Sequence, residues 1–334
     1  RMFKRNGGKV PGTTRPEHIK RLGNLGPVSS GYLNPVAASR RSARIVYPLR
    51  LLLFRAILGR IRGHPSNRQH DNVKYEKFLK DTVARMTKIN SEFLPHSDTI
   101  KYLLERLKPE DIENIRRKMV NRLLRMKRLY GMRTGDWLSR SCRYFRLALD
   151  GVHYYSSTAP LPHSTHRTHS NGKTEYMLMA IEVSIVMPGG IRIPLMTEFI
   201  ENPNGEYDKQ DCELKAAKRL MQRLKDKFGR LKIILLLDGL YLCEDILKTC
   251  LLNGWHLSVT VNDNAPAFLR KSEEELAGKS AGRCTDTDSK DERTRNVFWR
   301  NGIKHKFGET EFTLNVIKMT KDNGKREDCQ VYAT

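Results

Sequence analysis

The sequence has no apolar run near the length that a membrane-spanning helix needs. None of its stretches approaches the roughly 18–20 consecutive apolar residues that cross a bilayer. Its six cysteines are few for 334 residues, and they form no C-x-x-C pair. These absences exclude a helical membrane span and argue against a disulfide framework or a zinc site built on paired cysteines. We expect reduced thiols and no membrane partner.

Acidic residues are scarce beside basic ones. The chain has 61 Lys and Arg against 37 Asp and Glu, which gives a formal net charge of +24. A surplus of this size predicts a polyanionic partner, most simply nucleic acid bound through its phosphates. An anionic membrane surface is the weaker alternative. Hydrophobic residues still make up 39% of the chain, enough for a globular core.

The first part of the chain is the most basic. Residues 1–50 hold eleven Lys or Arg and one acid, Glu17, among many Gly, Pro, Ser and Asn. We expect residues 1–48 to be a basic flexible tail, either simply solvated or tracking along DNA. Residues 49–141 follow as a helical region that we expect to bind DNA.

Three stretches of this region have helical periodicity: residues 49–62, with arginines on one side, residues 73–92, and residues 98–129. Ser97 or Asp98 is the expected cap of the third, in which Pro109 begins a new helix. That last helix has an apolar stripe of Ile112, Ile115, Met119, Leu123 and Met126. The rest of its surface is basic, and it is either solvated or in contact with DNA. The candidate DNA contacts on it are Arg116, Arg117, Arg122 and Arg125.

Beyond residue 142 the pattern changes to strands. Strands are expected at 144–149, 175–187, 191–199, 232–237 and 256–261, with helices at 211–228 and 243–252. The second and third strands form an antiparallel hairpin around P-G-G at 188–190. The order β, β–β, α, β, α, β predicts an α/β sheet that begins with a hairpin.

Two of these strands lead into an aspartate and a glycine. Y-F-R-L-A-L is followed by Asp150, and I-I-L-L-L by Asp238. We expect such apolar strands to be buried on both faces and ligands to bind beyond their ends. If the strands are neighbours, two unpaired carboxylates repel each other, and Mg²⁺ or Mn²⁺ would relieve this. Either Asp-Gly pair alone is commonly just a turn or a helix start.

The amino-acid sequence of residues 94–275 resembles that of insertion-sequence DDE transposases. The most specific pieces are E-F-I-E-N…D-K-Q-D-C-E-L-K-A-A-K-R-L at 198–220 and I-L-L-L-D-G-L-Y at 234–241. The resemblance implies an RNase H-like mixed five-stranded sheet with flanking helices over residues 142–334. It also implies metal-dependent cleavage of transposon-end DNA and strand transfer into a target.

The resemblance implies roles for several residues. Asp150 and Asp238 become the first two catalytic acids and hold Mg²⁺ or Mn²⁺. Lys209 becomes a candidate phosphate contact, and Trp299 a candidate for stacking on a flipped base. The third acid, a Glu on a late helix, normally follows a β-rich insertion, and residues 262–334 look like the beginning of that insertion. We therefore expect the third acid beyond residue 334.

The implied partners are the double-stranded DNA of the transposon ends and of the target, bound by a homodimer in a synaptic complex. The implied location is the cytoplasm, in association with the nucleoid. Two alternatives stay open. One is an RNase H-like nuclease that cuts without strand transfer. The other is a truncated, inactive remnant that only binds DNA, which the lack of a third acid favours.

Overall fold

The structure is a computed structural model that describes residues 47–63, 66, 68–72, 77–90, 93–135, 143–187, 190–202, 211–287, 294–322 and 327–334. The chain divides into two compact units, residues 1–119 and 120–334. The basic tail predicted for residues 1–48 lies almost wholly outside the described residues. The predicted domain boundaries stay predictions. In the part that the structure describes, no helix is both long and apolar enough to cross a membrane.

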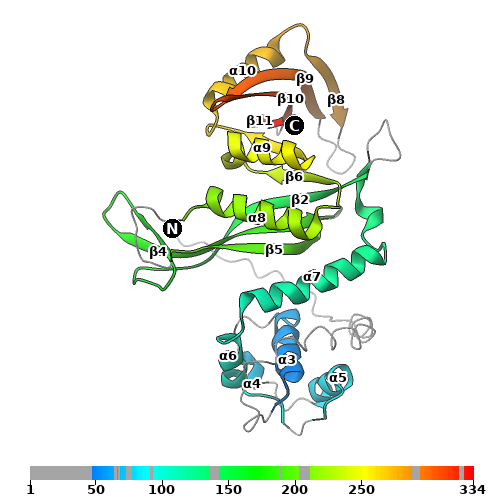
Figure 1. Cartoon of the computed structure of the whole chain (residues 1–334), viewed down its shortest axis with the longest axis vertical. Helices are drawn as coiled ribbons and strands as arrows, with labels where there is room; N and C mark the ends of the chain where they lie inside the picture. Colours follow the sequence, from blue (N-terminus) through cyan, green and yellow to red (C-terminus); the bar gives the residue numbers. More distant parts are fainter. Residues whose placement is uncertain are drawn as a thin grey trace. The chain divides into compact units, whose positions relative to one another are not determined.

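The first unit is helical. Its elements are α3 (Leu49–Ile61), α4 (Gln69–Asn72), α5 (Lys77–Thr87), α6 (Ser97–Leu104) and the first part of α7 (Pro109–Arg125) (Figure 1). α3 contributes leucines to two apolar clusters, one shared with α5 and one with α6. α3 is thus covered on two sides, and Arg55 is buried with it at 0% exposure.

The predicted cap of α6 is also wrong. The N-cap is His96, whose Nδ1 accepts a hydrogen bond from the backbone N–H of Asp98 at 3.2 Å. Ser97 has a different partner, because its backbone N–H and hydroxyl donate to the carboxylate of Asp71 at 2.9 and 2.6 Å. The serine thus ties two helices together, and a charged acceptor is a stronger partner than a helix N–H donor.

α7 begins at Pro109 as predicted, but its buried face is displaced from the predicted stripe. Val120 and Leu124 are the buried residues, four positions apart, and they belong to the core of the second unit. Three members of the predicted stripe are instead largely exposed: Ile112, Met119 and Met126. Those three residues are apolar and regularly spaced, but their side chains do not face the core.

The second unit is built on one mixed sheet (Figure 1). Its strands are β1 (Thr134–Gly135), β2 (Arg143–Ser157), β3 (Thr165–Thr168), β4 (Thr174–Val186), β5 (Arg192–Ile200), β6 (Ile233–Leu237), β7 (His256–Val261), β8 (Gly282–Thr287), β9 (Thr294–Phe307), β10 (Thr310–Asp322) and β11 (Glu327–Ala333). The order is β3-β4-β2-β6-β7-β11-β10-β9-β8, with β5 also beside β4 and β1 beside β2. β6 runs parallel to β2 and β7, and the other pairings are antiparallel. The predicted mixed α/β class is confirmed.

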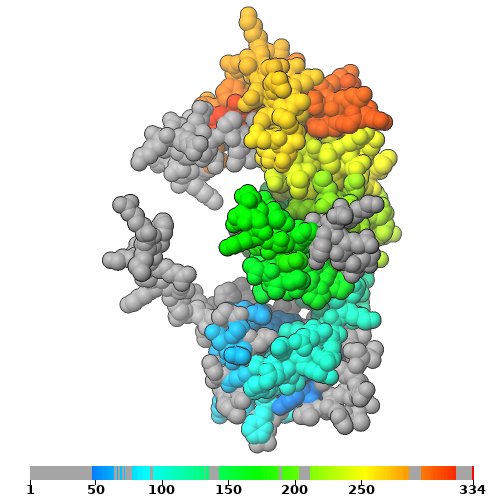
Figure 2. All heavy atoms as spheres, turned by 90° about the vertical axis from the view of Figure 1, so that its left-hand side faces the viewer, coloured from blue at the N-terminus to red at the C-terminus, as the bar shows by residue number. Residues whose placement is uncertain are grey.

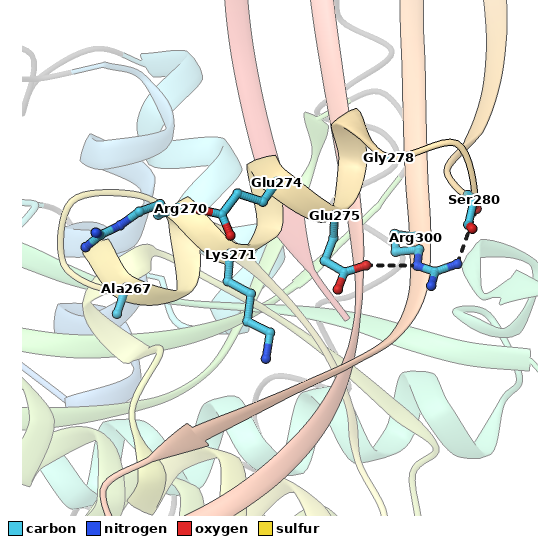
Figure 3. Close-up of a pocket in the computed structure, with 8 residues that line it drawn as sticks. All are labelled: Ala267, Arg270, Lys271, Glu274, Glu275, Gly278, Ser280 and Arg300. Carbon is cyan, nitrogen blue, oxygen red and sulfur yellow. Dashed lines mark hydrogen bonds and ion pairs between the residues drawn. The ribbon is translucent and has the colours of Figure 1, made fainter.

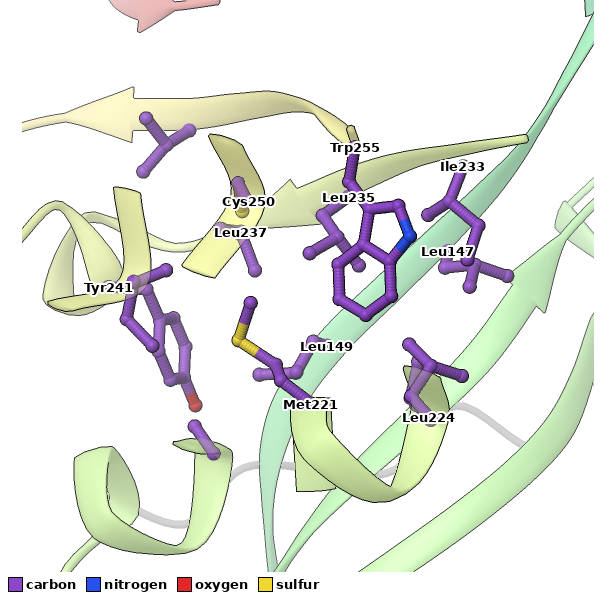
Figure 4. Packing of buried hydrophobic residues seen from close by; sticks show 14 of the residues in the cluster. Leu147, Leu149, Met221, Leu224, Ile233, Leu235, Leu237, Tyr241, Cys250 and Trp255 are labelled. Carbon is purple, nitrogen blue, oxygen red and sulfur yellow. The ribbon is translucent and has the colours of Figure 1, made fainter. Parts of the chain in front are cut away.

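Much of the core lies between this sheet and two helices, α8 (Glu213–Phe228) and α9 (Glu244–Asn253), with further side chains from α7 and from the helix that follows β7. Leu147 and Leu149 of β2 pack with Met221 and Leu224 of α8 (Figure 4). The prediction that the strands are buried on both faces is wrong. In β6, residues 233, 235 and 237 are buried but residues 234 and 236 are only partly so, because the two helices pack on one face. Each buried leucine stabilises the fold by about 1.5–3 kcal/mol.

Residues 262–334 continue the same sheet. After α10 (Pro266–Ala277), the chain forms the four strands β8 to β11. β11 joins this group to the rest of the sheet by pairing Val331 with Val261 of β7. Figure 2 shows the segment that contains β6 and β7, coloured yellow-green to yellow, between the green segment that contains β4 and β5 and the orange segment of the last strands.

Candidate active site

The two predicted aspartates lie on strands that run side by side at the centre of the sheet. β2 and β6 pair in parallel from Phe145↔Ile233 to Ala148↔Leu236. Asp150 and Asp238 come two residues later on each strand, in the same register. Adjacent strands lie about 4.8 Å apart, so the two carboxylates start from neighbouring backbone positions. Both residues are exposed.

The prediction that Asp150 follows the end of its strand is wrong. β2 continues to Ser157, because β4 goes on pairing with it beyond the aspartate. Only the pairing with β6 stops, since β6 ends at Leu237. Asp238 does follow a strand end, and its Oδ1 accepts a hydrogen bond from the backbone N–H of Gly239 at 2.6 Å. The two aspartates therefore lie at the point where the pairing between β2 and β6 ends.

A third carboxylate reaches this point from α8. A Cβ atom added to Gly151 would lie 2.9 to 3.1 Å from the carboxyl atoms of Glu213. Burial and then the charge of Asp150 raise the pKa of Glu213; Asp238 acts in the same direction and the hydroxyl of Tyr241 opposes it. Glu213 is therefore close enough to both aspartates for its ionised form to be disfavoured by their charge.

The two glycines after the aspartates make room for other side chains. A Cβ atom on Gly239 would lie 2.3 Å from Oδ1 of Asn262, the residue that follows β7. Gly151 leaves the corresponding space for Glu213. Neither glycine has a positive φ, so neither is there for a left-handed turn. The repeated Asp-Gly pair is thus explained by close packing around the aspartates.

Tyr241 lies in the short 3-10 helix η5 (Gly239–Tyr241) that Asp238 caps. It is 1% exposed, and its ring packs in the core (Figure 4). Its hydroxyl has no hydrogen-bond partner within 3.5 Å among the described residues, and it interacts with the Glu213 carboxylate at longer range. Burial, followed by the charges of Glu213, Asp150 and Asp238, raises the pKa of the phenol. The buried hydroxyl of Tyr241 is therefore close enough to these three carboxylates to be affected by their charge.

A fourth carboxylate, Glu182, lies across from Asp150 on β4. Directly opposed Cβ atoms in an antiparallel pair are about 4.5–5.5 Å apart. Glu182 is half-buried, and it accepts a hydrogen bond from the hydroxyl of Ser184 at 2.8 Å. It already has a partner within its own strand.

Carboxylate oxygens are the donors that Mg²⁺ and Mn²⁺ prefer, so the chemistry of this cluster fits such a cation. The present spacing is not that of a preformed cage. Within the described ranges, no three His, Cys, Asp or Glu side chains are placed to hold one ion. Mutual repulsion spreads free carboxylates apart, and a cation between them would reverse that tendency.

The predicted DNA contacts are scattered. On α7, Arg116 pairs with Glu113 at 3.7 Å, Arg117 donates to Asn114 at 3.1 Å, and Arg122 and Arg125 are exposed. Lys209 lies outside the described residues. Nothing here places any of them against the carboxylate cluster.

Trp299, the residue predicted to stack on a base, lies in β9, where it is half-buried. Its indole covers Gly282 of β8 so closely that a Cβ atom there would lie 2.1 Å from the ring. The ring is thus packed on the neighbouring strand, and its role in stacking stays a prediction.

A shallow pocket lies elsewhere, between α10 and β9 (Figure 3). Its charged side chains largely offset one another: the guanidinium of Arg300 contacts Glu275 at 3.2 Å and donates to the carbonyl of Ser280 at 3.3 Å. None of the four carboxylates of the cluster lines it. We therefore place the candidate chemistry at the cluster.

No family model matches the chain, and no curated protein matches its sequence. Among solved structures, it is similar to a chain of the piggyBac transposase synaptic complex with hairpin DNA, at a TM-score of 0.36 and 11% identity. The match covers 96% of this chain and 61% of that chain. At this TM-score the likeness is too slight to bear on activity.

The sequence did not predict Asn262 as part of the site, and it assigned no definite role to Glu213 or Tyr241. Each follows a different element, at the start of α8, after β6 and after β7. Their common location depends on the pairing of β2, β6 and β7, which no local pattern reveals. The only sequence signal was the glycine after each aspartate, because each glycine accommodates one of these neighbours.

Proposed function

We propose that the chain is a DDE-type DNA transposase, which cleaves phosphodiester bonds at transposon ends and joins the freed ends to target DNA. The supporting observation is the parallel register that sets Asp150 beside Asp238, in a chain of net charge +24. The sequence resemblance to insertion-sequence transposases agrees with it. Because two ends are cut together, the working form is a homodimer in a synaptic complex.

In this proposal Asp150 and Asp238 bind Mg²⁺ or Mn²⁺ beside the scissile phosphate. The bound cation would activate the attacking oxygen and stabilise charge on the leaving one. The protein's own contribution is to hold two carboxylates rigidly on paired strands, so that the substrate phosphate is positioned before reaction. Exposed bases such as Arg122 and Arg125 bind DNA phosphates and position the duplex.

The test uses the full chain with a duplex taken from the terminal DNA of the element that encodes it, in the presence of Mn²⁺. Products are separated by length, so that cleaved and joined strands are distinguished. Asp150→Asn and Asp238→Asn should each abolish both products. Asp226→Asn removes an exposed acid elsewhere on α8 and should leave both unchanged.

The other outcomes separate the alternatives. Cleavage that depends on both aspartates but gives no joined products indicates an RNase H-like nuclease. Salt-sensitive DNA binding without any cleavage, unchanged by the two Asp→Asn variants, indicates a DNA-binding remnant. For the DNA contacts, Arg122→Ala or Arg125→Ala should lower the slope of log K against log salt by about 1 each.

A further inference from the structure

The first turn of α8 brings a carboxylate to the candidate site from outside the two predicted strands. We propose that Glu213 is a third ligand for the divalent cation and that the buried hydroxyl of Tyr241 positions it. This inference rests on the proposed function. It replaces the expectation that the third acid must come from a helix beyond residue 334.

An acid in the first turn of a helix is common, because it interacts favourably with the helix dipole. That reason alone does not account for Glu213. Its carboxylate lies against the backbone of Gly151, the residue after Asp150, and not in solvent beyond the helix. It is also half-buried, and burial disfavours a charged carboxylate. A position that is unfavourable for an isolated carboxylate is the expected one for a cation ligand.

Tyr241 supplies an independent observation. A hydroxyl group that is 1% exposed normally has a hydrogen-bond partner. That of Tyr241 has none within 3.5 Å among the described residues, and the side chain with which it interacts at longer range is Glu213. With a cation bound, we expect the interaction between this hydroxyl and the Glu213 carboxylate to tighten into a hydrogen bond. The hydroxyl can then hold one carboxyl oxygen while the other faces the two aspartates.

Glu182 is the competing candidate, since it lies opposite Asp150. Its carboxylate is already engaged by the hydroxyl of Ser184. The carboxylate of Glu213 instead lies against Gly151, the residue after Asp150. Glu182→Gln is therefore the matched control: the same chemical change at a carboxylate of the same cluster.

The experiment measures the binding of Mn²⁺ to the full chain without DNA, by the loss of the free-ion signal in electron paramagnetic resonance. Glu213→Gln should raise the Kd for Mn²⁺ about tenfold or more, and Tyr241→Phe should raise it about 10-fold, as outer-shell substitutions do. Glu182→Gln should leave it within about twofold. Glu213→Asp should restore part of the affinity lost in Glu213→Gln. Circular dichroism establishes that each variant is folded.

If Glu213→Gln does not fold, Gly151→Ala provides a second route. Its Cβ atom would displace the Glu213 carboxylate while the charge remains, and it should also weaken Mn²⁺ binding. The inference is overturned if Asp150→Asn and Asp238→Asn abolish binding while Glu213→Gln does not change it, or if Glu182→Gln has the larger effect. If the two aspartate variants bind Mn²⁺ as the wild type does, the proposed function fails as well.

Discussion

Replacing Tyr241 by phenylalanine should make the protein more stable in the absence of divalent cations. The substitution removes one oxygen atom and keeps the ring, which is 1% exposed and packed among core residues (Figure 4). It therefore opens almost no cavity. What it removes is a hydroxyl with no hydrogen-bond partner among the described residues.

The expected magnitude follows from two opposing contributions. A buried polar group without a partner destabilises the folded state by about 1–3 kcal/mol. The attraction between the hydroxyl and the nearby Glu213 carboxylate offsets part of this, by about 0.5–1.5 kcal/mol. The difference predicts that Tyr241→Phe raises the free energy of unfolding by about 1 kcal/mol. For a unit of this size, that corresponds to a rise in Tm of about 2–4 °C.

The measurement is urea denaturation with a chelator present, followed by circular dichroism, with the m-value checked for constancy. Tyr155→Phe, at a position that is 57% exposed, is the control and should change stability by less than about 0.5 kcal/mol. A loss of more than about 1 kcal/mol in Tyr241→Phe would refute the reasoning, because it would mean that the hydroxyl is already well hydrogen-bonded. The same variant is expected to bind Mn²⁺ more weakly. A more stable protein with weaker Mn²⁺ binding would show that the hydroxyl oxygen of Tyr241 serves cation binding and not stability.

Three further predictions concern the same region. The raised pKa of Glu213 means that the folded state binds the proton of this carboxyl more tightly than the unfolded state does. The resulting stabilisation is present at low pH and is lost as pH rises from 4.5, the ordinary pKa, through the raised pKa of the folded state. Glu213→Gln should lack this loss in cation-free urea titrations at several pH values. Gly239→Ala should destabilise by about 1–3 kcal/mol, because its Cβ atom would lie 2.3 Å from Asn262, whereas Gly131→Ala, with open space around it, should be nearly neutral in thermal unfolding. Arg219→Ala should lower Tm, because this guanidinium donates at 2.6 Å to both Glu198 and Asp211. Its removal would leave Asp211 without its arginine partner, while Glu198 keeps Arg223. Since Arg219 is partly exposed, we expect about 1–2 kcal/mol, and an unchanged Tm would contradict the assignment.

Local patterns predicted most of the elements in the second unit. The apolar run of β6 and the amphipathic spacing of α8 are encoded within a few neighbouring residues, and their bounds agree with the prediction to within two residues. Asp238 could be located because it stands directly after a strand. The length of β2 could not be predicted, because it continues past Asp150 only through its pairing with β4.

Where tertiary contacts decide, the predictions failed. The stripe on α7 was chosen from regular spacing, but Val120 and Leu124 are the residues that face the core. Ser97 is a good cap by type, yet Asp71, from another helix, binds it more strongly. Glu213 is far from both aspartates in sequence, so its place beside Gly151 depends on how α8 packs on the sheet. Residue types predict chemistry, while the choice of partner needs the fold.

The pairing of β11 with β7 has a consequence for synthesis. Among the described strands, β8 to β10 adjoin the rest of the sheet only through β11, which is made after them. While a ribosome produces this chain, β2 to β7 can pair with one another well before that strand emerges. During this interval the open edge of β7 is a site for pairing with another nascent chain. We expect rapid synthesis at high concentration to favour aggregation through this edge, and slower synthesis to favour correct closure of the sheet.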